Sequence, residues 1–122
     1  MLINLSNHPY SQWSNAQQQV AITQFGNCID LPFPAVNAEG DENYIDSLTD
    51  EYLEKVLLLS KENNQTITVH VMGEMTFTYA LLAKLKAQNI AAVASTSERK
   101  SIDLGNGQKS VEFNFVRFRS YY

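Results

Sequence analysis

The first 95 positions of the chain alternate between short apolar runs and longer amphipathic segments. Continuous apolar runs are typical of strands buried in a parallel sheet, and amphipathic segments are typical of the helices that cover it. The runs predict strands at residues 2–6, 28–33, 66–72 and 90–95. The amphipathic segments predict helices at about residues 12–25, from the acidic stretch after Gly40 to Lys61, and at residues 76–88.

Residues typical of helix ends mark the limits of these segments. Ser14 and Gln17 have the spacing of a capping box, and Gly26 suits the end of the first helix. Thr76 is expected to cap the third helix. The second helix carries one apolar stripe at three- and four-residue steps, which we expect to be buried: Ile45, Leu48, Tyr52, Val56 and Leu59.

The tail of the chain follows a different pattern. Residues 100–104 and 111–121 flank the turn sequence Gly105-Asn106-Gly107, which predicts an antiparallel hairpin. Its apolar positions change phase between Phe115 and Val116. The change predicts a β-bulge or a changed environment at that point.

The order of elements predicts one α/β domain over residues 1–122. Right-handed crossovers give a mainly parallel, Rossmann-like sheet of order 2-1-3-4, with helices on both faces and the hairpin at the C-terminus. Ligands of such sheets bind outside the carboxyl ends of the strands, where the strand order reverses. The loops expected there are residues 6–10, 73–77 and 96–100.

Composition fits a folded protein without a membrane span. The chain is 44% hydrophobic, but no apolar run approaches the roughly 20 residues that a spanning helix needs. No basic and apolar leader opens the chain, so we expect it in the cytoplasm. Cys28 is the single cysteine, and no Cys/His cluster indicates a metal site. We therefore expect no disulfide, metal or cofactor.

Charge is divided unevenly along the chain. The net charge of −4 argues against a general DNA-binding protein. Residues 1–54 contain eight acids and no Lys or Arg, whereas residues 55–122 contain nine bases and five acids, so the two parts carry −8 and +4. An anionic ligand would therefore be held by the second part. The alternative is that these charges are only solvated helix surfaces.

The first predicted loop contains groups that could carry chemistry. Ser6 and Asn7 offer hydrogen bonds, and the imidazole of His8 could act as a general acid or base. The alternative is a surface histidine in an ordinary turn. Trp13 could stack on a base, but we expect it to pack in the core.

The second and third loops suit an anion. Gly73 allows close approach to the backbone, and free amides at a helix start favour negative charge, so Gly73, Glu74, Met75, Thr76 and Phe77 form one candidate group. After the fourth strand, hydroxyl and basic groups suit a phosphate: Thr96, Ser97, Arg99 and Lys100. A solvated turn is the alternative there.

Two further polar residues are expected to be structural. His70 lies in the third strand on the same face as Thr66 and Thr68, and we interpret it as a half-buried histidine with satisfied hydrogen bonds. Cys28 is interpreted as a small core hydrophobe, because no neighbour in the sequence would activate its thiol.

Three segments resemble the small stand-alone CARF-type proteins of type III CRISPR antiviral defence. These are Leu2–Pro9, Val69–Thr76 and Val93–Arg99, which look like the family's first strand with its polar loop, its glycine-threonine loop and its last core strand. The resemblance spans the first to the fourth strand. The chain departs from the common pattern around Thr76, where many members carry a second glycine and a basic residue.

The resemblance implies a single CARF-like domain that binds cyclic oligoadenylate, with the tetra-adenylate ring favoured, as a homodimer with one ring on its two-fold axis. It also implies a ring nuclease that cleaves by attack of the ribose 2′-hydroxyl, without a metal. In that scheme His8 assists proton transfer, while Arg99, Lys100 and the amides of residues 73–77 stabilise charge. Ser6, Asn7 and Thr76 would position the ribose or the phosphate.

Three other functions are alternatives to the ring nuclease. A non-catalytic binding module would hold the ring without turnover. A small metal-dependent hydrolase would recruit Glu74 with His8 or Asp30. A structural subunit would use the aromatic tail, residues 113–122, as a contact surface.

Overall fold

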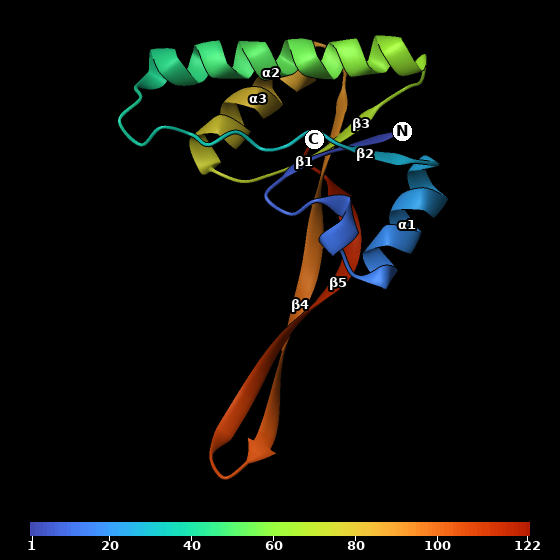
Figure 1. The fold of residues 1–122 in the computed structure, drawn as a ribbon, viewed down its shortest axis with the longest axis vertical. Coiled ribbons are helices and arrows are strands. Elements are labelled where there is room, and N and C mark those ends of the chain that lie inside the picture. Colours follow the sequence, from blue (N-terminus) through green and yellow to red (C-terminus); the bar gives the residue numbers. More distant parts are fainter.

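The computed structural model describes all residues, Met1–Tyr122, as a sheet with helices on both sides and a long two-stranded extension (Figure 1). In chain order the elements are β1 (Leu2–Ser6), the 3₁₀ turn η1 (Tyr10–Gln12), α1 (Asn15–Phe25), β2 (Cys28–Asp30), α2 (Glu42–Asn63), β3 (Thr68–Met72), α3 (Met75–Ala87), β4 (Ala91–Gly105) and β5 (Gln108–Ser120). None of the helices is long and apolar enough to cross a membrane.

The sheet has the order β2-β1-β3-β4-β5. The first four strands are parallel, and β5 runs antiparallel to β4 at the edge. The predicted order 2-1-3-4 is therefore confirmed, with one strand added. The predicted second and third strands are shorter in the structure: β2 ends at Asp30, ahead of Pro32, which has no N–H to donate, and β3 begins at Thr68.

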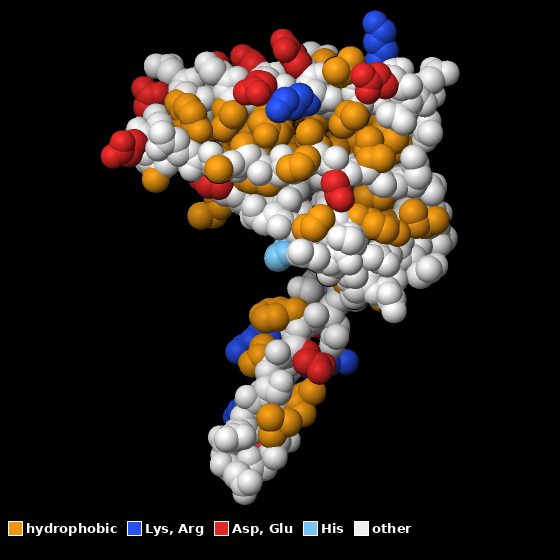
Figure 2. Space-filling view, viewed as in Figure 1, with side chains coloured by type: hydrophobic (Ala, Val, Ile, Leu, Met, Phe, Trp, Pro, Cys, Tyr) orange, Lys and Arg blue, Asp and Glu red, His pale blue; other side chains and the backbone are white.

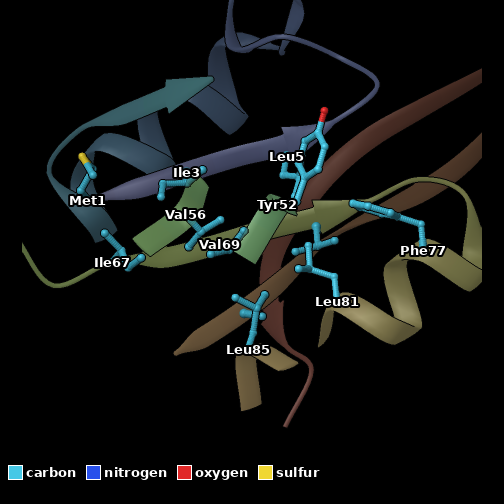
Figure 3. Packing of buried hydrophobic residues seen from close by; sticks show 12 residues of the cluster. Met1, Ile3, Leu5, Tyr52, Val56, Ile67, Val69, Phe77, Leu81 and Leu85 are labelled. Atoms are coloured by element: carbon cyan, nitrogen blue, oxygen red, sulfur yellow. The ribbon is translucent and has the colours of Figure 1, made fainter. Parts of the chain in front are cut away.

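Two clusters of buried side chains hold the helices on the two faces of the sheet. Alternate residues of β1 and β3 pack against α2 and α3, where Val56, Phe77, Leu81 and Leu85 are fully buried (Figure 3). The other face packs against α1 through Leu2, Trp13, Ala21, Val93 and Phe118. Helices on both faces are therefore confirmed, and so is the core position of Trp13.

The caps of α1 agree with the sequence. The Ser14 hydroxyl accepts a hydrogen bond from the Gln17 amide at 3.2 Å, and Gly26 ends the helix with a φ of 88°. The helix begins at Asn15 and not at residue 12, because Trp13 and the cap residue have extended backbone. The short turn η1 occupies the preceding residues.

The cap of α3 differs from the prediction. Glu74, not Thr76, is the cap: its carboxylate accepts hydrogen bonds from the amides of Thr76 at 3.0 Å and Phe77 at 2.8 Å. A carboxylate at this end also interacts favourably with the helix dipole. The helix consequently starts at Met75, one residue earlier than predicted.

The segment 96–100 is part of a strand, so its prediction as a loop was wrong. β4 continues to Gly105 because β5 supplies hydrogen-bonding partners along its length. The register shifts between Thr96 and Ser97, which leaves Val116 as an extra residue. This confirms the predicted bulge. It also keeps Phe115 and Phe118 in contact on one side of the sheet, with ring centroids 5.0 Å apart.

Beyond the bulge, β4 and β5 form a ribbon that projects from the body of the molecule (Figures 1 and 2). We call residues 97–114 the arm. Asn106 and Gly107, with φ values of 54° and 75°, make the turn at its tip. Val111 and Phe113 are exposed on it, with Phe113 68% accessible. The predicted hairpin is thus confirmed, and it is longer than expected.

Candidate functional site

A pocket of about 760 Å³ lies where β1 and β3 end and β4 passes into the arm, the place predicted from the strand order. Its volume is within the range of about 300–1,000 Å³ that small-molecule sites have. The lining residues are Ser6, Asn7, His8, Gln12, Trp13, Ser14, Gln17, His70, Met72, Gly73, Ser95, Thr96, Ser97, Phe113 and Phe115. No Asp, Glu, Lys or Arg is among them. Hydroxyl, amide, imidazole and aromatic groups therefore determine its chemistry.

The first loop contributes an imidazole on a fixed backbone. The carbonyl oxygen of His8 accepts hydrogen bonds from Asn4 Nδ2 at 2.8 Å, Trp13 Nε1 at 3.1 Å and Ser6 Oγ at 3.1 Å. The residue itself is exposed. Its side chain can therefore meet a ligand while its backbone stays in place.

The second loop contributes only Gly73 to the pocket. A Cβ atom at this position would lie 2.3 Å from the Phe33 ring, so the close packing of this loop needs glycine. Phe77 is buried in the core and Met75 is 83% exposed. Hydrogen bonds from the Phe77 amide and from the hydroxyl and amide of Thr76 lower the pKa of Glu74. The Glu74 carboxylate therefore occupies the helix start at which an anionic ligand was expected.

Only part of the third segment lines the pocket. Thr96 and Ser97 line the pocket, whereas Arg99 and Lys100 do not. Arg99 pairs with Phe113 in the β4–β5 register, so its side chain shares a face with a lining residue. Lys100 pairs with Glu112 on the opposite face. The structure therefore brings Arg99 to the outer edge of the pocket and turns Lys100 away from it.

The wall of the pocket contains a hydrogen-bonded network around His70, a residue that the sequence predicted to be structural. His70 Nδ1 is 3.0 Å from Asn4 Oδ1, and His70 Nε2 is 3.2 Å from Ser95 Oγ. The predicted satisfied histidine is confirmed, and it is more buried than expected, at 2% exposure. Burial lowers the pKa of His70 to about 4. The imidazole is consequently neutral at physiological pH.

Cys28 and Asp30 lie on β2, next to this network. The Asp30 carboxylate accepts hydrogen bonds from Asn4 Nδ2 at 2.9 Å and from the Tyr10 amide at 3.0 Å. Burial, with the nearby Asp30 charge, raises the pKa of the Cys28 thiol to about 12. The interpretation of Cys28 as an unreactive packing residue agrees with this. No group of three or more His, Cys, Asp or Glu side chains is arranged to hold a metal ion.

Several lining residues were missed from the sequence. Gln12 and Gln17 come from the turn and helix after the first loop, Phe113 comes from the arm, and Phe115 comes from β5 next to the arm. Polar residues inside strands could have indicated the network, because Asn4 and His70 interrupt apolar runs and lie opposite each other in the parallel register. The arm gave no such signal, since its contact with the pocket depends on tertiary structure.

Comparison with known proteins gives a family. Neither a curated protein nor a solved structure matches the chain. The model of the family described as "Uncharacterized protein MJ1673 family" matches residues 1–119. The match covers almost the whole chain, and the chain therefore belongs to the MJ1673 family.

Proposed function

We propose that this chain binds cyclic oligoadenylate in the pocket at the ends of β1 and β3, beside the middle of β4, and opens the ring. The observation that carries the proposal is the composition of the pocket. Aromatic rings, neutral hydrogen-bonding groups and one exposed imidazole surround a single cavity. The resemblance of three chain segments to CARF-type proteins supports the same ligand.

Adenine bases would stack on the aromatic wall. Phe113 and Phe115 line one side of the pocket, and Phe113 offers an exposed face. Stacking of a base on such a ring contributes about 1–3 kcal/mol. It needs no charge in the pocket.

Ribose and phosphate groups would be held by neutral donors. Each phosphodiester carries one negative charge, which hydroxyl and amide groups such as those of Ser6, Asn7 and Ser97 can solvate. The Arg99 guanidinium at the outer edge of the pocket can bind two phosphate oxygens at once. A ring of identical nucleotides can present the same groups to two copies of the chain, so the proposal includes a homodimer.

Ring opening would use the ribose itself as the nucleophile. His8 takes the proton of a 2′-hydroxyl, the oxygen attacks the adjacent phosphorus, and the bond from phosphorus to O5′ breaks. The leaving oxygen takes up a proton, so the products are a 2′,3′-cyclic phosphate and a 5′-hydroxyl. The step consumes no water. Binding in an in-line geometry contributes most of the acceleration.

The test is incubation of the protein with cyclic tri-, tetra- and hexa-adenylate in EDTA, with binding and products followed together. We expect linear products with 2′,3′-cyclic phosphate ends. His8→Ala should slow cleavage by about 10²–10⁴-fold and leave binding in place. Arg99→Ala should weaken binding, whereas Lys109→Ala, an equal charge change near the arm tip, should not.

Two results would change the proposal. Tight binding without products makes the chain a binding module for the messenger. Binding of no ring rejects the ligand class. Of the carboxylates that a metal-dependent hydrolase would recruit, Glu74 already caps α3 and Asp30 is bound to Asn4 and Tyr10.

A further inference from the structure

A chain of hydrogen bonds crosses the sheet and ends in a hydroxyl group at the pocket wall. It runs from the Asp30 carboxylate through Asn4 and His70 to Ser95, with heavy-atom separations of 2.9, 3.0 and 3.2 Å. β2, β1, β3 and β4 each contribute one of these residues. Adjacent strands of the sheet therefore fix the geometry.

The partners of Asn4 determine which nitrogen of His70 carries the proton. The two amide hydrogens of Asn4 go to the carbonyl oxygen of His8 and to the Asp30 carboxylate, both of which can only accept. The amide oxygen of Asn4 therefore faces His70, and Nδ1 of the imidazole donates to it. In a neutral ring, Nε2 then presents its lone pair to the Ser95 hydroxyl.

The surroundings keep the imidazole neutral and oriented. Trp13 and Phe118 pack edge-on against the ring, with centroids at 5.2 and 5.6 Å. Asp30 at the far end of Asn4 and His8 in the same pocket are the nearby titratable residues. Burial lowers the pKa of His70 to about 4, so its Nε2 is unprotonated and can accept a proton at neutral pH.

We propose that Ser95 is a nucleophile, activated by His70 as its general base and oriented through Asn4. A nucleophile within hydrogen-bond reach of a base, which a third group orients in turn, is the arrangement that serine nucleophiles use. Ser95 also lies 3.1 Å from Met72 Sδ, but a thioether is a weak acceptor and leaves the hydroxyl proton to the imidazole. The neutral hydrogen-bonding groups of the lining admit an uncharged acyl or phosphonyl ester as the electrophile.

The reaction can be written with a probe of that class, an alkyl fluorophosphonate. Ser95 Oγ attacks phosphorus, its proton passes to His70 Nε2, the O–P bond forms, and fluoride leaves. The proton then passes to solvent, so one serine phosphonate ester and one hydrogen fluoride equivalent result. This reactivity requires no nucleotide and stands apart from the proposed ring opening.

The experiment is stoichiometric labelling of the intact protein with the fluorophosphonate, with the site found by mass spectrometry. We expect one label, at Ser95, and none in Ser95→Ala. Ser101→Ala is the matched control, because Ser101 is a serine of the same strand that lies outside the pocket lining. His70→Gln should slow labelling by about 10²–10⁴-fold, the usual contribution of a general base.

A second measurement uses the unaltered protein, so it holds even if the His70 variant does not fold. The labelling rate should be half-maximal near pH 4, the pKa of His70. No label, a label on another residue, or equal labelling of His70→Gln and the wild type would overturn the inference. So would a midpoint near pH 6.5, the value of an ordinary histidine.

Discussion

Acidification should destabilise this protein through one buried side chain. His70 is neutral in the folded state with a pKa of about 4, whereas a histidine in the unfolded chain has a pKa near 6.5. Between these values the unfolded chain binds the proton and the folded protein does not. The contribution of His70 to the free energy of unfolding is therefore fully present above about pH 6.5 and is lost as the pH decreases toward 4.

The size of the effect follows from the difference between the two pKa values. The pKa difference of about 2.5 corresponds to about 3.5 kcal/mol at about 1.4 kcal/mol per pH unit, and about 3 kcal/mol of this is lost between pH 7 and pH 4, because at pH 4 the folded protein is itself half protonated at His70. This is a large share of the stability of an ordinary domain, about 5–15 kcal/mol. The ring is only 2% exposed, so solvent screens its protonation little.

The assay is urea unfolding at pH 7 and pH 4, for the wild type and for His70→Gln. The variant removes the titrating group and keeps a polar side chain, so it corrects for all other groups that titrate. We expect the wild type to lose about 3 kcal/mol more than the variant over this range. An equal loss in the two proteins would refute the argument that burial keeps His70 neutral.

Three substitutions test the packing around the site. Glu74→Ala removes the cap of α3 and should lower the midpoint of urea unfolding, with α3 fraying in hydrogen exchange; unchanged protection of the helix start would contradict this. Leu81→Ala, at a fully buried position, should lower the free energy of unfolding by about 2–5 kcal/mol, whereas Leu58→Ala, at 54% exposure, should change it by no more than about 0.5 kcal/mol. Similar losses in the two variants would contradict the packing described. Gly73→Ala should lower the melting temperature, because its Cβ would lie 2.3 Å from the Phe33 ring; an unchanged melting temperature would mean that the ring moves aside freely.

Much of the fold was predictable because it depends on local signals and general connection rules. The apolar runs fixed the parallel strands, and Ser14 and Gly26 marked the limits of α1. Right-handed crossovers then determined the strand order, and with it the place of the pocket. The phase change at Val116 indicated the bulge from the sequence alone.

The predictions differ from the structure where tertiary contacts, and not the local sequence, determine the conformation. Residues 96–100 have no apolar pattern of a strand, and they are extended because β5 pairs with them. Glu74 was weighed as a ligand group, but the free amides of Thr76 and Phe77 are its nearest partners. The contact of Ser95 with His70 joins residues 25 positions apart, so no local pattern could reveal it.

The most direct test of the account is the incubation of the purified protein with cyclic tetra-adenylate in EDTA, followed by separation of free ring, bound ring and products. The account predicts binding and linear products that end in 2′,3′-cyclic phosphate, with His8→Ala binding the ring and failing to open it. No measurable binding of this ring, or of the tri- and hexa-adenylate rings, would contradict it.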